Sequence, residues 1–321
     1  MQKLKIVFLD QITLGDSSLK RFTDLKEKYK NQIDIEFKFY DSTAKNETLE
    51  RVQNAQIVVT NKVVINSEIM RNSDIKMICV TATGINNIDL ETAKNLNIPV
   101  NNVAGYSTES VLSQTFSMLF YLMNSSKYYD DYVKSGKYAE TSVFTHIGRN
   151  FSELKGKKVG IIGFGTIGKR VAEVFEAFGT TVFYYSTSGQ NNDENYSRLE
   201  LDKLLETCDI ISIHAPLNSN TQYLLNKNNL HLVKNSAVIL NIGRGGIINE
   251  DDLFDAMNQK DNLKVGLDVL EQEPIVKNHK LLTFEERIFI SPHIAWTGVE
   301  ARERLLETTK SQIEEFITSQ I

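Results

Sequence analysis

Cysteine and long apolar runs are scarce in this sequence. Its 321 residues include only 2 cysteines, Cys79 and Cys208, which form neither a disulfide framework nor a CxxC metal motif. This cysteine content is typical of a reducing, cytoplasmic compartment. The apolar stretch 116–123 is far shorter than the roughly 20 residues that a membrane helix needs. The sequence therefore gives no sign of a disulfide-built scaffold or of a membrane span.

An excess of basic residues is also lacking. The chain has 36 Lys and Arg against 41 Asp and Glu, a net charge of −5, whereas nucleic-acid binders are normally basic. This charge balance gives no reason to expect a nucleic-acid partner. The histidines outside the motifs described below show no metal-ligand spacing, so no metal is expected either. With 41% hydrophobic residues the chain can fill a sizeable core, and its length predicts two domains.

Segments typical of strands and helices alternate along the chain. After Gly156, six short apolar segments start about 23–28 residues apart, the length of one strand and one crossover helix. They are 158–162, 181–185, 209–213, 237–241, 264–268 and 288–291. An earlier series comprises 6–10, 33–40, 57–60, 77–81 and 98–101. The alternation predicts an α/β protein with two doubly wound parallel sheets. Helices are expected over 108–124 and in the tail after Trp296, which is expected to return to the first domain.

A glycine-rich motif follows the first strand of the later series. Gly163-Phe-Gly165-Thr-Ile-Gly168 lies between segment 158–162 and an expected helix, which is the setting of a dinucleotide-binding turn. Gly163 permits the tight turn, Gly165 lets the backbone approach a pyrophosphate, and Gly168 allows close packing of helix on strand. The N–H groups of Thr166 and Ile167, with the helix dipole, favour the pyrophosphate charge.

The ribose end of this motif is less regular. An acidic residue is expected at the end of the second strand, where it binds the ribose hydroxyls of NAD and repels the 2′-phosphate of NADP. Ser186 occupies that position, no acid appears before Asp193, and the nearest arginine is Arg198. The sequence therefore leaves both NAD and NADP open as cofactor.

Three charged residues follow other strands of the later series. Arg244 comes after segment 237–241 and is flanked by glycines, Glu273 follows 264–268, and His293 follows 288–291. Ligands of open α/β sheets bind beyond the carboxyl ends of the strands, so these three residues can converge. Arginine suits a two-pronged grip on a carboxylate, and histidine transfers protons near neutral pH.

These motifs together resemble the D-isomer-specific 2-hydroxyacid dehydrogenase family, with glycerate dehydrogenase or hydroxypyruvate reductase-like members the most similar. The resemblance covers almost the whole chain. It rests on the glycine turn and on Asn241-Ile-Gly-Arg-Gly245, the segment from Asp268 to Glu273-Pro274, Ser291-Pro-His-Ile-Ala-Trp296, Ala82-Thr-Gly-Ile-Asn-Asn-Ile-Asp89 and Asn102-Val-Ala-Gly-Tyr-Ser-Thr-Glu109. Ser186 departs from the family's usual acidic residue.

The resemblance implies an arrangement of domains. A Rossmann NAD(P)-binding domain, residues 102–296, is expected to be inserted in a flavodoxin-like substrate domain made of 1–101 and 297–321. The family also implies a homodimer joined through the nucleotide domains.

The resemblance also implies an activity: reversible hydride transfer between a nicotinamide cofactor and a small 2-oxo acid or D-2-hydroxy acid, with hydroxypyruvate and glycerate favoured. His293 would donate the proton, Glu273 would orient His293 and favour its charged form, and Arg244 would hold the substrate carboxylate. Backbone N–H groups around Thr83 and Gly84 would hold it too. Further cofactor contacts are expected from Arg244 and His293 and from Thr108, Ala215, Pro216, Thr221, Ile242, Gly243 and Asp268.

Two other functions stay open at this point. One is a formate dehydrogenase-like enzyme, which needs no proton donor to a carbonyl oxygen, so the Glu273 and His293 pair favours hydroxy-acid chemistry instead. The other is a non-enzymatic, nicotinamide-sensing regulator that keeps similar residues; a turnover assay separates the two classes.

Overall fold

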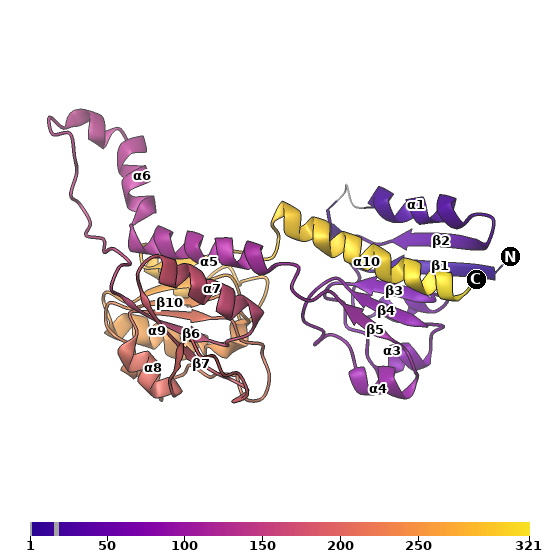
Figure 1. The fold of residues 1–321 in the computed structure, drawn as a ribbon. Coiled ribbons are helices and arrows are strands. Elements are labelled where there is room, and N and C mark those ends of the chain that lie inside the picture. The colour runs from indigo at the N-terminus through magenta and orange to yellow at the C-terminus, as the bar shows by residue number, and fades with distance from the viewer. Residues whose placement is uncertain (1, 16–18) are drawn as a thin grey trace. The chain divides into compact units, whose positions relative to one another are not determined.

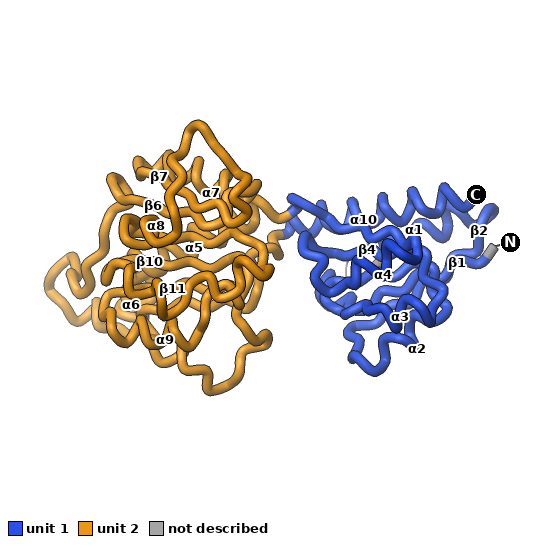
Figure 2. The backbone as a smooth tube through the Cα atoms, turned by 90° about the horizontal axis from the view of Figure 1, so that it is seen from below, with its two compact units in different colours: residues 1–106, 299–321 blue, residues 107–298 orange. Residues whose placement is uncertain are grey.

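The computed structural model describes residues 2–15 and 19–321. The chain forms two compact units: unit 1 is Met1–Tyr106 with Val299–Ile321, and unit 2 is Ser107–Gly298 (Figure 2). Each unit has its own parallel sheet. Within the described ranges, none of the helices has the length and apolar character that a membrane span requires.

Unit 1 is built on a five-stranded sheet in the order β2-β1-β3-β4-β5, with every neighbouring pair parallel. This is the flavodoxin-like order. Buried apolar residues on the strands meet helices on both faces of the sheet. The strands are β1 (Gln2–Phe8), β2 (Ile33–Phe39), β3 (Ile57–Thr60), β4 (Met77–Val80) and β5 (Val100–Asn102).

The helices of unit 1 include one from the end of the chain. The sequence-local helices are α1 (Leu19–Tyr29), α2 (Thr48–Val52), α3 (Ser67–Arg71) and α4 (Leu90–Asn95), and the last is α10 (Val299–Ser319). Helix α10 contacts β4 and α1. Its Arg304 Nε donates to Tyr106 O at 2.9 Å, and Gln312 Nε2 donates to Asn102 O at 2.9 Å. These bonds attach the C-terminal helix to the first 106 residues of the chain.

Unit 2 has a seven-stranded parallel sheet in the order β12-β11-β10-β9-β6-β7-β8. The order reverses at β6, where β9 lies on one side and β7 on the other, as in a Rossmann sheet. The strands are β6 (Lys158–Ile162), β7 (Thr181–Tyr185), β8 (Ser197–Arg198), β9 (Ile210–Ile213), β10 (Val238–Asn241), β11 (Lys264–Leu267) and β12 (Ile288–Ile290).

Two apolar cores cover the two faces of this sheet. Along β10, Val238 and Leu240 pack in one core and Ile239 in the other, because successive side chains of a strand point to opposite faces. Helices α5 (Thr108–Met123) and α7 (Thr166–Ala177) cover the first core, and α8 (Leu201–Thr207) and α9 (Glu250–Gln259) cover the second (Figure 1). This double burial explains why the strands are almost continuously apolar.

The predicted α/β class with two doubly wound parallel sheets is confirmed. All six segments expected in the later series are strands within one residue of the predicted ends. Strand β8 was not predicted from the sequence, because it consists of only two exposed polar residues at the edge of the sheet. The domain boundaries at 101 and 297 stay predictions.

One segment of unit 2 projects from the body of that unit. It is residues 126–151, here called the arm, and comprises α6 (Ser126–Lys134), a 3-10 turn (Lys137–Glu140) and an extended return (Figure 1). No residue of α6 is buried. The arm therefore contributes little to the core of unit 2.

Candidate active site

The residues singled out in unit 2 lie at one edge of its sheet. All strands of the sheet run parallel, so their carboxyl ends share that edge. In the spatial order of the strands, the edge carries His293 after β12, Asp268 and Glu273 after β11, Arg244 after β10, Ala215 after β9, the glycine turn after β6 and Ser186 after β7.

Three glycines shape the turn between β6 and α7. Gly163 has φ +90°, and a Cβ there would lie 2.7 Å from the backbone N of Ala215. A Cβ on Gly168 would lie 2.2 Å from Gly163 O, so neither position accepts a side chain. A Cβ on Gly165 would meet no atom within 4 Å. Bare backbone and the N-terminus of α7 thus border open space, which fits the pyrophosphate of a dinucleotide cofactor.

Ser186 belongs to a loop closed by its own hydrogen bonds. The Ser186 side chain is buried, and its Oγ accepts the backbone N–H of Asn191 at 3.2 Å. Arg198, on the edge strand β8, reaches the same loop, where its Nη1 donates to Gly189 O at 3.0 Å. The structure therefore brings a guanidinium to the loop in which the sequence has no acid.

The side chains of Glu273 and His293 are within hydrogen-bond distance of each other. His293 Nδ1 lies 2.8 Å from Glu273 Oε2, and Glu273 Oε1 accepts the backbone N–H of Leu270 at 3.1 Å. The His293 side chain remains 22% exposed. Its backbone has φ +54°, a conformation that is costly for a residue other than glycine and that clusters at functional sites. The contact at Nδ1 leaves Nε2 as the ring nitrogen available for proton transfer.

Asp268 holds the loop that carries His293. Its buried carboxylate accepts the Oγ–H of Ser291 at 2.6 Å and the backbone N–H groups of Ile294 and Ala295 at 2.9 Å each. The His293 N–H also donates to Asp268 O at 2.9 Å. Resemblance to the family alone predicts Asp268 near the cofactor. This loop-holding role was not predicted, because its partners are one serine hydroxyl and two backbone N–H groups more than 20 residues away.

Arg244 lies in a loop fixed by Asn241 and packed against the Glu273 loop. Asn241 Nδ2 donates to Arg244 O at 2.8 Å, and Asn241 Oδ1 accepts the N–H of Gly243 at 3.1 Å. A Cβ on Gly245 would lie 2.0 Å from the carbonyl carbon of Leu270, so the two backbones are in direct contact. Among the residues that the structure describes, the Arg244 guanidinium has one hydrogen-bond partner, Gly243 O at 2.8 Å.

Two other histidines near this edge are engaged elsewhere. Burial lowers the pKa of His214 to about 3, so its ring stays neutral, and its Nε2 lies 2.8 Å from Ser212 Oγ. His279 Nε2 lies 2.9 Å from Glu250 Oε2. These surroundings favour His293 as the proton-transferring residue.

The remaining cofactor residues expected from the resemblance lie around the same edge. Thr221 is buried, and its Oγ1 donates to Pro216 O at 2.6 Å. Ala215 and Ile242 are buried, and Thr108 is the first residue of α5. Their contacts with a cofactor stay predictions.

Unit 1 carries its own loops at the carboxyl edge of its sheet. Thr83 and Gly84 follow β4, and Thr83 Oγ1 donates to Val103 O at 3.2 Å. Asp10 follows β1, and its carboxylate accepts the backbone N–H of Asn61 at 2.9 Å. Burial is the largest influence on the pKa of Asp10 and raises it. These loops are therefore fixed by hydrogen bonds within unit 1.

Known proteins are similar to this one along nearly the whole chain, both in sequence and in structure. The hydroxypyruvate reductase of Blautia hydrogenotrophica is 34% identical over 98% of this chain and 97% of that protein. Among solved structures, an acyclic imino acid reductase in complex with NADPH and D-Arg has a TM-score of 0.84 and 26% identity, covering 98% of each chain. The D-lactate dehydrogenase of Aquifex aeolicus, complexed with NAD and lactic acid, has a TM-score of 0.81 and 25% identity over 98% of this chain and 96% of that chain.

The family model described as "D-isomer specific 2-hydroxyacid dehydrogenase, NAD binding domain" matches residues 116–295. This match spans the glycine turn and the loops of Arg244, Glu273 and His293. The resemblance seen in the sequence motifs is confirmed: the chain belongs to the D-isomer-specific 2-hydroxyacid dehydrogenase family.

Proposed function

We propose that this protein is an NAD(P)-dependent D-2-hydroxyacid dehydrogenase that reduces a small 2-oxo acid, with hydroxypyruvate the favoured substrate. The contact between Glu273 and His293, on the sheet edge that also carries the glycine turn and Arg244, carries this proposal. The relative from Blautia supports the choice of substrate, since it is a hydroxypyruvate reductase.

The chain's own groups supply binding and proton transfer. A nicotinamide cofactor, when bound, would supply the hydride. His293 donates a proton from Nε2 to the carbonyl oxygen of the 2-oxo acid, while Glu273 holds Nδ1 and orients the ring. Arg244 binds the substrate carboxylate through its guanidinium. In unit 1, the backbone N–H groups around Thr83 and Gly84 are assigned to the same class of ligand, a carboxylate.

Turnover with a panel of substrates tests this function. Purified protein is mixed with NADH or NADPH and with hydroxypyruvate, glyoxylate, pyruvate or bulkier 2-oxo acids, and nicotinamide absorbance is followed. We expect turnover that is fastest with hydroxypyruvate. Cofactor binding without turnover on any 2-oxo acid would favour a nicotinamide-sensing regulator, and reduction of NAD by formate would favour the formate dehydrogenase-like reaction.

We infer further that the ribose loop accepts NADPH at least as well as NADH. Residues 186–192 contain no acid, and Arg198 places a positive charge against Gly189 O. The nearest carboxylate, Asp193, lies 3.0 Å from Lys169 Nζ, and this hydrogen bond is the largest influence on the pKa of Asp193, which it lowers. A 2′-phosphate would therefore meet no uncompensated negative charge in this loop.

Replacing Ser186 by aspartate should shift the cofactor preference toward NADH. We expect kcat/KM for NADPH to fall by about 100-fold, because a carboxylate in the loop repels the 2′-phosphate, while kcat/KM for NADH stays the same or rises. Arg198→Ala should weaken NADPH alone, by about tenfold. Lys203→Ala, which removes an exposed cation from α8, is the matched control. Equal losses for both cofactors in Arg198→Ala would contradict this assignment.

We also propose that the arm binds a second copy of the chain. Its side chains Phe144 and Ile147 are 89% and 83% exposed, and Val143 and Phe151 in the same short segment are exposed as well. Exposed apolar residues that gather in one place mark interaction sites.

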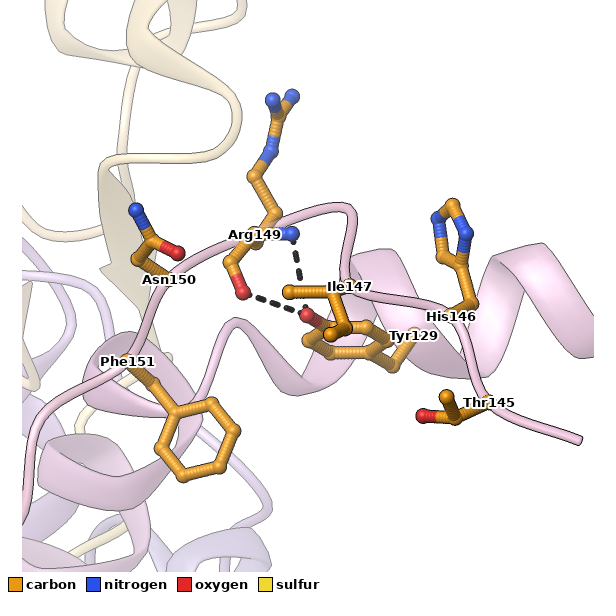
Figure 3. Close-up of a pocket in the computed structure, with 7 residues that line it drawn as sticks. All are labelled: Tyr129, Thr145, His146, Ile147, Arg149, Asn150 and Phe151. Atoms are coloured by element: carbon orange, nitrogen blue, oxygen red, sulfur yellow. Dashed lines mark hydrogen bonds between the residues drawn. The ribbon is translucent and has the colours of Figure 1, made fainter.

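The arm is nevertheless ordered by local contacts. The Tyr132 and His146 rings stack with their centroids 3.8 Å apart. The Tyr129 hydroxyl donates to Arg149 O and accepts the Arg149 N–H (Figure 3).

The double variant Phe144→Asp, Ile147→Asp should convert a dimer into a monomer. Two carboxylates in the middle of an apolar contact would have to lose their hydration, which costs several kcal/mol each. Light scattering after size exclusion measures the mass. Ile12→Asp, at an exposed position in unit 1, is the control and should leave the mass unchanged. A wild-type protein that is monomeric at all accessible concentrations would refute the dimer.

A further inference from the structure

Two glutamates connect the start of α9 to the loop that carries Glu273. Glu250 is the first residue of α9, and its backbone N–H donates to Glu271 Oε1 at 2.8 Å. In return the Glu271 backbone N–H donates to Glu250 Oε1 at 2.7 Å. Each carboxylate thus accepts the partner's backbone N–H. Bonds of this charge-assisted type are among the stronger hydrogen bonds in proteins.

Both glutamates have a second partner that fixes the remaining oxygen. Glu250 is only 7% exposed, and its Oε2 lies 2.9 Å from His279 Nε2. Burial is the largest influence on the pKa of Glu250 and raises it, while the Glu271 N–H and His279 oppose this effect. Glu271 Oε2 accepts the hydroxyl of Tyr223 at 3.0 Å. Burying a carboxylate carries a desolvation penalty even when hydrogen bonds offset part of it, so we expect Glu250 to have a functional role.

The backbone of Tyr223 indicates that this arrangement is held under strain. Tyr223 has φ +49°, which is a costly conformation for a bulky residue. Its N–H donates to Gly246 O at 2.8 Å, and its hydroxyl reaches Glu271. Strained residues of this kind persist only where the surroundings over-determine them, and they cluster at functional sites.

The connection ends next to the reacting groups. Glu271 lies between Leu270, whose N–H binds Glu273 Oε1, and Glu273 itself, whose Oε2 contacts His293. Leu270 also lies against Gly245, the residue after Arg244. A shift of the 270–271 backbone would therefore move the carboxylate partner of His293, whereas Asn241 holds the loop of Arg244 through its own hydrogen bonds.

We propose that Glu271 and Glu250 are positioning residues for the dehydrogenase reaction: their reciprocal hydrogen bonds set the place of Glu273, and through it the orientation of the His293 ring. This inference rests on the proposed function. Neither glutamate touches substrate or cofactor in this assignment, so its removal changes the rate of proton transfer and leaves ligand binding intact.

Kinetics of Glu271→Ala provide the test. The variant leaves the first N–H of α9 and the Tyr223 hydroxyl without this acceptor, and the side chain is exposed enough for the protein to fold without it. We expect kcat to fall about tenfold while KM for the 2-oxo acid and Kd for the cofactor change by less than about twofold. Glu271→Gln keeps one acceptor oxygen and should restore most of kcat.

A double-mutant cycle with Glu273→Gln separates positioning from a general loss of structure. If Glu271 acts through Glu273, adding Glu271→Ala to Glu273→Gln should lower kcat by less than about twofold more. Asp251→Ala is the matched control, because Asp251 is an acidic residue of the same first turn that pairs with Lys280 instead. It should leave kcat unchanged. A full tenfold loss in both backgrounds would overturn the proposal.

Amide hydrogen exchange of the unliganded protein gives a readout that does not depend on turnover. A peptide covering 268–275 should exchange faster in Glu271→Ala than in the wild type, and Asp251→Ala should not change it. If the wild type fails to turn over any 2-oxo acid, the proposed function fails while this measurement still decides whether Glu271 holds the loop. Unchanged exchange in Glu271→Ala would refute the role of Glu271 in holding the loop, whatever the reaction.

Discussion

Replacing His293 by asparagine should lower kcat for reduction of a 2-oxo acid by about 10³-fold, within the range expected for loss of a general acid. Asparagine can still accept or donate a hydrogen bond near Glu273, but it cannot deliver a proton near neutral pH. The hydride acceptor would then have to take its proton from water. Because the contact with Glu273 is made by Nδ1, the variant loses the group at Nε2 and disturbs the loop little.

Steady-state kinetics with a saturating nicotinamide cofactor measure this loss. His231→Asn is the control, since His231 is the exposed residue of a 3-10 turn (Leu230–Leu232) that precedes β10. Melting temperature should be nearly the same for both variants. Full reductase activity in His293→Asn would show that the proton comes from another group and would remove the central assignment of this site.

Most of the fold of unit 2 could be predicted because six of its strands are short and largely apolar, with cores on both faces of the sheet. In β10, for example, Val238, Ile239 and Leu240 all face apolar cores, so the strand is apolar at three successive positions. Strand β8 gives no such signal, since Ser197 and Arg198 are exposed. Its pairing with β7 depends on backbone hydrogen bonds at a sheet edge, which the residue types do not reveal.

The positions of the strand ends in the sequence also indicated which residues could lie close together. Parallel strands bring their carboxyl ends to one edge, so the positions of Arg244, Glu273 and His293 along the chain were enough to expect them on neighbouring strands. What each side chain does there was harder to foresee. Asp268 binds backbone N–H groups of a distant loop, and a backbone N–H is present at nearly every position of any sequence.

The glutamates that support the site were hidden for a related reason. In the sequence, Glu250 and Glu271 look like ordinary acidic residues of a helix start and of a loop, and 21 positions separate them. Their pairing depends on the close contact of Gly245 with Leu270, which aligns the start of α9 with the loop after β11. Tyr223 is similar, since nothing in its neighbours along the chain requires φ +49°. Such features become visible only when the backbones of separate loops are placed together.

Replacing Arg244 by alanine should lower kcat/KM for the 2-oxo acid by about 10²–10³-fold, because the substrate carboxylate loses two charge-assisted hydrogen bonds worth roughly 1.5–3 kcal/mol each, offset in part by water. The loop itself should stay in place. Asn241 bonds the backbone of Arg244 and Gly243, and the guanidinium contributes only the bond to Gly243 O.

Two comparisons make the result specific to carboxylate binding. Arg244→Lys keeps the charge but loses the planar fork, so it should recover only part of the lost kcat/KM. Arg71→Ala removes an arginine from α3 in unit 1 and should have no effect. If Arg244 grips the carboxylate, the loss in Arg244→Ala should also exceed the loss on an uncharged carbonyl compound of similar size, since that compound offers nothing for the guanidinium to bind. An equal loss on both would mean that Arg244 acts on the carbonyl alone, and the carboxylate would then have to be bound by other groups.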